Sequence, residues 1–166
     1  MSFRHHRQSQ DIQVSLDHMH RSLDTYGLDR NSTVLIGSCC LACVNIRAPR
    51  DIDVLVSPQE FETLHDQLAT PSGIPLKPLF HTDRPWLYAV YRPQGVMSLD
   101  ITRPADFLST DEVLDELFQQ EMANLPQTDE GWHYLTAELA LEAMARSHAR
   151  KNRQDIKQLK KNLEAQ

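Results

Sequence analysis

The chain has 166 residues, enough for one domain with a single buried core and a helical extension. Its apolar content of 40% and its 5 glycines are those of an ordinary globular protein and exclude a low-complexity chain. No run approaches the roughly 18 to 20 apolar residues that cross a bilayer, and the start, MSFRHHRQSQ, lacks the apolar segment of a signal peptide. We therefore expect no membrane contact and a cytoplasmic location.

The formal charge of -6 at pH 7 is unevenly distributed along the chain. Residues 146–166 hold seven Lys or Arg and two Asp or Glu, so this segment carries +5 and the preceding chain carries -11. A polyanion such as RNA would be attracted to the basic segment and repelled by the remainder. Two interpretations are open for this segment: a contact with RNA or phosphate, and a solvated helix face.

The first half of the chain alternates between helix and strand. Apolar residues spaced by three and four predict an amphipathic helix over 11–26, ended by Gly27. A short buried strand is expected at 33–36, a helix at 39–46 and a strand at 51–56.

Further along, Ser57-Pro58 is typical of the cap and first turn of another helix, roughly 59–68. Two β-like segments follow at 86–91 and 96–102. The sequence Arg92-Pro-Gln-Gly95 between them is turn-like and indicates a hairpin.

The remainder of the chain is helical in pattern. Helices are expected at 110–122 and 132–163, split by a loop at 126–131, with a break in the second near Ser147. This order of elements predicts an α/β or α+β fold, with a mixed sheet flanked by helices.

A single domain over residues 1–166 is expected. Its core would lie at about 30–103, and its C-terminal helical part at about 104–166.

Three cysteines lie within five residues, and their odd number excludes a fully paired disulfide framework. They are Cys39, Cys40 and Cys43. We interpret them as small apolar residues that pack a helix beneath the sheet, with a metal or redox role as the alternative.

Two aspartates open an otherwise apolar strand in the run DIDVLV. Asp is a poor strand former, so sheet propensity does not account for them. Residues two apart on a strand face the same way, which places Asp51 and Asp53 together and the apolar residues opposite. Two carboxylates held this close repel each other unless a cation lies between them. Mg²⁺ is the simplest candidate, because proteins hold it with one or two carboxylates plus substrate phosphates.

A third carboxylate, Asp100, lies between apolar neighbours in the later strand SLDIT. If this strand lies beside the first, Asp100 comes close to Asp51 and Asp53. Three carboxylates can hold two metal ions about 4 Å apart. That arrangement is suited to in-line displacement at phosphorus.

The pieces VLIGS, RAPRDIDVLV and SLDIT resemble the signature of the polymerase-β-like nucleotidyltransferase superfamily. That signature is an apolar strand, Gly-Ser or Gly-Gly, a helix, an Asp-x-Asp strand and a later single-Asp strand. The likeness covers about residues 33–102 and implies a nucleotidyltransferase-like mixed sheet.

The resemblance also implies roles for individual residues. Asp51, Asp53 and Asp100 would hold Mg²⁺ or Mn²⁺, and Asp100 would help to deprotonate the acceptor. Ser38 and the backbone around Gly37 would contact the phosphates of a nucleoside triphosphate at a helix N-terminus.

The run 150–159 resembles the basic, Asp-containing helix near the end of small bacterial nucleotidyltransferase-like proteins, including abortive-infection toxin relatives. There a lysine is followed directly by an acid, whereas this chain has Lys151-Asn152. The likeness implies that Lys151 reaches the nucleotide phosphates and that Asp155 orients it or braces the fold. An exposed helix packed through its apolar residues accounts for the spacing equally well.

Arg47 and Arg50 flank the entry to the aspartate strand. An arginine fork fits a phosphate, so both are candidates for nucleotide binding, although turn arginines are often simply solvated.

The leading hypothesis is a metal-dependent enzyme that transfers a nucleoside monophosphate from a triphosphate to a hydroxyl and releases pyrophosphate. The acceptor would be RNA, protein or a small molecule. The alternative is a non-catalytic module that binds a nucleotide or partner, as in a toxin–antitoxin pair. In a third interpretation, the three aspartates pair with Arg47, Arg50 and Arg103 and need no metal.

Overall fold

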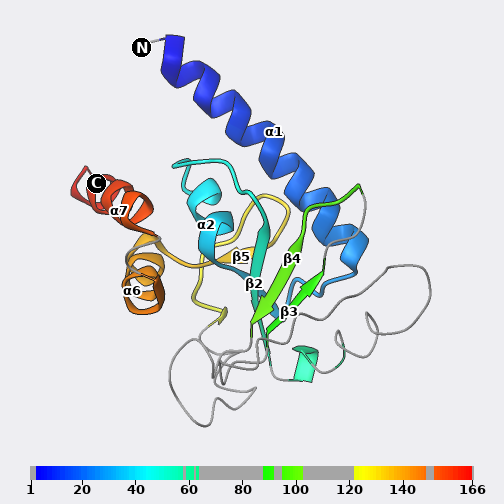
Figure 1. Ribbon diagram of the computed structural model, residues 1–166. Coiled ribbons are helices and arrows are strands. Elements are labelled where there is room, and N and C mark those ends of the chain that lie inside the picture. The colour runs from blue at the N-terminus through cyan, green and yellow to red at the C-terminus, as the bar shows by residue number, and fades with distance from the viewer. Residues whose placement is uncertain are drawn as a thin grey trace.

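The computed structural model describes residues 3–57, 59–61, 63, 88–91, 95–102, 122–148 and 152–165. These residues form a mixed α/β fold (Figure 1). The helices are α1 (Phe3–Tyr26), α2 (Gly37–Cys43), α6 (Ala137–His148) and α7 (Arg153–Glu164). The strands are β1 (Thr33–Leu35), β2 (Ile52–Val56), β3 (Tyr88–Tyr91), β4 (Leu99–Thr102) and β5 (His133–Tyr134).

The strands form one five-stranded sheet in the order β3-β4-β2-β1-β5. β2 is parallel to β4 and antiparallel to β1, and β5 runs parallel to β1 at one edge. In the central pair, Asp53 lies directly opposite Asp100. The sheet register therefore brings the two acidic strands together, as the sequence predicts.

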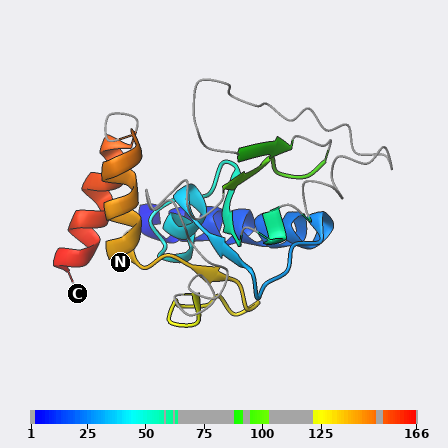
Figure 2. The ribbon, with the colours of Figure 1, turned by 90° about the horizontal axis from the view of Figure 1, so that it is seen from below.

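The two faces of the sheet are covered by different helices (Figures 1 and 2). α1 packs on the face to which the apolar residues of β2 point, and α2, α6 and α7 cover the other face. The first cluster includes Met19, Leu23, Ile52, Val54, Val56, Leu99 and Ile101. The second includes Val34, Leu41, Leu55, Ala140, Met144 and Leu159. Since neighbouring strand residues alternate, Asp53 and Asp100 face the α2, α6 and α7 side.

Helix α1 confirms the amphipathic pattern but begins earlier than the expected residue 11. Met19 and Leu23 are fully buried, and Gly27 follows the helix at φ +71°. The segment before residue 11 contains neither proline nor glycine, so nothing in it stops the helix. It needs no apolar face, because the first turns of α1 extend beyond the rest of the described chain (Figure 1).

Helix α2 is shifted relative to the expected range 39–46, because its end is set by a left-handed residue. Asn45 adopts φ +57°. The Ile46 N–H donates to the Leu41 carbonyl at 2.8 Å, and the Asn45 N–H donates to the Ala42 carbonyl at 2.9 Å. These two bonds form a Schellman motif, which satisfies the last carbonyls of the helix and reverses the chain toward β2.

The expected cap at Ser57 is confirmed. Its hydroxyl accepts a hydrogen bond from the Glu60 N–H at 3.1 Å, and residues 59–61 and 63 are helical. The remainder of this helix and nearly all of the helix expected at 110–122 lie outside the described residues.

The expected antiparallel pairing of the next two strands is confirmed by β3 and β4, and β4 begins at residue 99 instead of 96. Residues 92–94 of the expected turn lie outside the described residues. The prediction of a helix over 132–163 is wrong at its start, because residues 133 and 134 form strand β5. These residues pair with β1, and the Leu135 N–H donates to the Leu35 carbonyl at 3.2 Å. A sheet edge that offers backbone partners overrides the local helical pattern. The expected break near Ser147 corresponds to the boundary between α6 and α7.

None of the described helices is both long enough and apolar enough to span a membrane.

The three cysteines pack against the sheet as small apolar residues. Cys39 and Cys40 are buried, and Cys43 is half-buried. Burial raises the pKa of all three thiols, that of Cys43 to about 12. At neutral pH the thiols are therefore protonated and weakly nucleophilic.

We expect Cys39 and Cys40 in the folded protein to react with iodoacetamide at about pH 8 at least about a hundredfold more slowly than in the urea-unfolded chain. Mass spectrometry of the labelled peptides measures both rates, and the partly exposed Cys43 serves as an internal comparison. Fast native labelling of Cys39 would contradict the packing role and favour a redox role.

Candidate functional site

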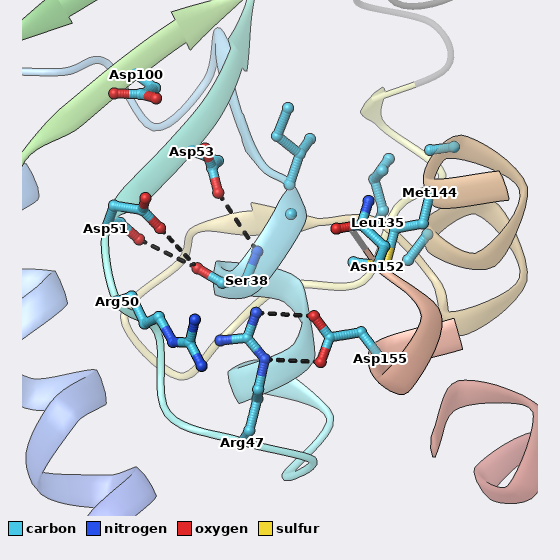
Figure 3. A pocket seen from close by; sticks show the side chains of 14 residues that line it. Ser38, Arg47, Arg50, Asp51, Asp53, Asp100, Leu135, Met144, Asn152 and Asp155 are labelled. Atoms are coloured by element: carbon cyan, nitrogen blue, oxygen red, sulfur yellow. Dashed lines mark hydrogen bonds and ion pairs between the residues drawn. The ribbon is translucent and has the colours of Figure 1, made fainter. Parts of the chain in front are cut away.

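The three predicted aspartates converge in space. One carboxylate oxygen from each of Asp51, Asp53 and Asp100 can be chosen so that all three atoms lie within 4.8 Å of one another. All three residues are half-buried, and the group lies at one end of a pocket of about 350 Å³ (Figure 3). This is the only group of three or more acidic, His or Cys side chains with metal-ligand spacing among the described residues.

Backbone pairing fixes this convergence. β2 and β4 are parallel neighbours with Asp53 opposite Asp100, so both side chains leave the same face of the sheet at the same level. Asp51 precedes β2 by one residue and shares the face of Asp53. The Ile52 N–H donates to the Ser98 carbonyl at 2.8 Å, which extends the pairing to the start of the strand.

Ser38, at the start of α2, bonds to both aspartates of the DID motif. Its hydroxyl donates to Asp51 Oδ1 at 3.2 Å, and its N–H lies 3.4 Å from Asp53 Oδ2 (Figure 3). The donors that the resemblance implies for phosphate are thus turned toward carboxylates here. They partly offset the repulsion between the two charges.

Position 37 requires glycine, both for its backbone conformation and for the space around it. Its φ of +54° lies in the left-handed region, and a Cβ added to it would overlap the Asp53 carboxylate, with Cγ at 3.0 Å. No larger residue fits between β1 and α2 without displacing Asp53. The Gly-Ser pair therefore serves the aspartates directly.

A buried tyrosine of α1 contacts the segment just before the strand that carries the third aspartate. Burial, and secondarily the charge of Asp100, raises the pKa of Tyr26. The Tyr26 hydroxyl donates to the Met97 carbonyl at 2.7 Å, and the Met97 N–H donates to the Ser22 hydroxyl at 3.2 Å. α1 thereby holds the segment that leads into β4.

Arg47 makes an ion pair that the sequence does not reveal. Its Nε and Nη2 donate to the two carboxylate oxygens of Asp155, each at 2.9 Å, and its Nη1 donates to the Ala48 carbonyl at 3.1 Å. These bonds to Asp155 are the largest cause of the raised pKa of Arg47, whose charge also interacts with Asp51 and Asp53. The pair joins α7 to the loop before β2.

Arg47 and Arg50 both line the pocket (Figure 3). Arg50 is exposed. Gly37 and Ser38 line the same pocket, whereas Lys151 lies outside the described residues.

Sequence reasoning missed the wall of the pocket opposite the aspartates. There Leu135 and the α6 residues Ala140, Ala143 and Met144 present an apolar surface, and Asn152 and Asp155 complete it (Figure 3). The apolar periodicity of α6 predicts a buried face but cannot indicate that part of it borders a pocket.

The interpretation in which the aspartates pair with neighbouring arginines is wrong for Arg47, which pairs with Asp155. Arg103, another arginine in that interpretation, lies outside the described residues.

Comparison of the chain with models of known families, with curated proteins and with solved structures finds no match.

Gly37 and Gly27 form a matched pair for testing the close approach to Asp53, because both have positive φ and only Gly37 has a crowded Cβ position. We expect Gly27→Ala to lower the free energy of unfolding by about 1 kcal/mol. We expect Gly37→Ala to lower it by about 2 to 4 kcal/mol, because overlap adds to backbone strain. Urea unfolding measures both, and equal losses would contradict the crowding at Gly37.

The Arg47–Asp155 pair should contribute more to stability than the exposed Arg30–Asp24 pair. Its side chains are 26% and 16% exposed, against 47% and 57% for the other pair. In double-mutant cycles with Arg→Met and Asp→Ala, we expect a coupling energy of about 1 to 3 kcal/mol for Arg47–Asp155. We expect less than about 1 kcal/mol for Arg30–Asp24. Urea unfolding of the variants measures both coupling energies. Coupling energies below about 1 kcal/mol for both pairs would show that the Arg47–Asp155 pair does not brace α7.

Proposed function

We propose that the protein is a metal-dependent nucleotidyltransferase that moves a nucleoside monophosphate from a nucleoside triphosphate to a hydroxyl group. The observation that carries the proposal is the convergence of Asp51, Asp53 and Asp100 within 4.8 Å in a pocket that also holds Arg47 and Arg50. Acidic ligands for a cation and basic ligands for phosphate thus line one cavity.

The donor set fits Mg²⁺ or Mn²⁺. It consists of carboxylate oxygens only, which hard cations prefer to nitrogen or sulfur. Like charges this close repel each other, and a divalent cation held between them would offset that repulsion. When bound, a divalent cation neutralises charge on the triphosphate and lowers the pKa of an acceptor hydroxyl.

The groups in the pocket account for the bond that forms, the bond that breaks and the proton that is released in the reaction. The acceptor oxygen forms a bond to the α-phosphorus, and the bond from that phosphorus to the α,β-bridging oxygen breaks. Asp100 accepts the hydroxyl proton, and pyrophosphate leaves with the electron pair of the broken bond. Positioning and charge stabilisation suffice for this chemistry, so no covalent nucleophile is needed.

The two arginines suit the phosphates. Arg47 uses one N–H of each of its three nitrogens on Asp155 and Ala48, which leaves one N–H on Nη1 and one on Nη2. These donors and the positive charge are suited to a phosphate oxygen. Asp155 therefore acts as a positioning residue for Arg47, and Arg50 supplies a second charge.

The apolar wall suits the nucleoside. Leu135 and Met144 lie across the pocket from the aspartates (Figure 3). A base and sugar packed there would place the phosphates between the apolar wall and the carboxylates. Asn152 is the polar side chain on that wall with both a donor and an acceptor for a base edge.

The test incubates the protein with each α-labelled triphosphate, Mg²⁺ and total cell RNA or lysate. We expect Asp51→Asn with Asp53→Asn to reduce label transfer at least about a hundredfold, because the cation is no longer held. The control, Asp11→Asn with Asp129→Asn, makes the same charge change at two exposed positions outside the pocket and should transfer normally.

Transfer that survives the substitution of both site aspartates would contradict the metal site. No transfer from any triphosphate, together with Mg²⁺-dependent triphosphate binding that is lost in the site variant only, would favour the non-catalytic module.

A further inference from the structure

Helix α7 presents different chemistry on opposite sides. Leu159 is fully buried in the core cluster beneath α6, with Ile156 and Leu163 packed against it. Asp155, on the first turn, lines the pocket and holds Arg47. At about 100° per residue, these side chains fall within one sector of about 100° of the helix circumference.

The opposite side of α7 carries a basic stripe. Its four basic residues are exposed, and at about 100° per residue they also fall within a sector of about 100°. They are Arg153, Lys157, Lys160 and Lys161. The stripe extends about 12 Å along the helix, from the turn that borders the pocket to the last turn.

The basic stripe carries four positive charges and one negative charge. The ion pairs among the described residues do not involve it, and Glu164, four residues after Lys160 and three after Lys161, is the one acid of α7 on that side. Arg153, Lys157 and Lys161 are spaced by four, so like charges face each other along the helix and destabilise it. A bound polyanion removes this repulsion.

The composition of this face favours a nucleic acid over a protein partner. Every exposed residue of α7 is polar, and glutamines accompany the basic residues. Protein interfaces have an apolar or aromatic centre and are depleted in lysine. Phosphate backbones are bound by Lys and Arg, with Gln among the other contacts.

We propose that single-stranded RNA binds along the basic stripe of α7 and is the hydroxyl acceptor of the transfer, an assignment that rests on the proposed function. The first turn of α7 carries both Arg153 on the stripe and Asp155 in the pocket, so a strand on the stripe has to pass around this one turn to enter the pocket. The aspartates are half-buried there, which suits an unpaired 3′ end better than a duplex. The terminal ribose supplies the attacking hydroxyl.

The test measures binding of a fluorescent single-stranded RNA of about 20 nucleotides by anisotropy, without triphosphate or Mg²⁺. The variant K157Q/K160Q/K161Q removes three charges from the stripe. We expect it to bind about tenfold more weakly at moderate salt, with a log–log salt slope smaller by about 2, because three phosphate contacts are lost.

A charge-matched control separates the position of the charge from net charge. The variant Q10E/V14E/R21Q makes the same net change at exposed positions of α1 and should bind RNA like the native protein. Equal binding by the two variants would overturn the proposal. Fluorescent polyglutamate bound through the same lysines, with no binding of RNA, would also overturn it in favour of an acidic protein partner.

Two further measurements keep this proposal distinct from the proposed function. The stripe variant should retain Mg²⁺-dependent triphosphate binding, and the Asp51→Asn, Asp53→Asn variant should retain RNA binding. If the native protein binds no triphosphate, the proposed enzymatic function is contradicted. If it binds triphosphate normally but binds no RNA, only the proposal that RNA is the acceptor is contradicted.

Discussion

The central constraint on the site is that three carboxylates lie within 4.8 Å of one another, where like charges repel. Folding brings these charges together because the parallel pairing of β2 and β4 places Asp53 opposite Asp100. The site reduces the cost with donors from one short turn. The Ser38 hydroxyl bonds to Asp51, the Ser38 N–H faces Asp53, and Gly37 leaves room for the carboxylate. The charge of Arg47, which also interacts with Asp51 and Asp53, offsets part of the remaining repulsion.

A second constraint joins the C-terminal helix to the site. Arg47 lies before β2 and Asp155 lies on α7, 108 residues later, yet they form a bidentate ion pair at the edge of the pocket. Leu159 anchors the same helix in the core. α7 is therefore held by both an apolar contact and an ion pair, and it presents its remaining face to solvent. One helix thus contributes to the core, to the side of the pocket that holds Arg47 and to the basic surface.

Much of the site could be predicted from local sequence. A strand that begins with two aspartates two residues apart places them on one face regardless of the rest of the fold. Gly-Ser before a helix and a later aspartate between apolar residues complete the pattern. The predicted residue range of α2 was shifted because Asn45, rather than a glycine, takes the left-handed conformation that ends it. β5 was mistaken for helix because its partner is the edge of β1, about 100 residues earlier.

The sequence by itself determined which carboxylates share a face, because strand alternation is a local property of the backbone. It also determined that α7 is amphipathic and basic, because helical spacing is local too. Only the tertiary structure decided that β4 lies beside β2, that Arg47 pairs with Asp155 and that α6 forms an apolar wall of the pocket. These contacts join residues far apart in the chain, and their partners are selected by packing and by the burial of charge, which spacing along the sequence does not record.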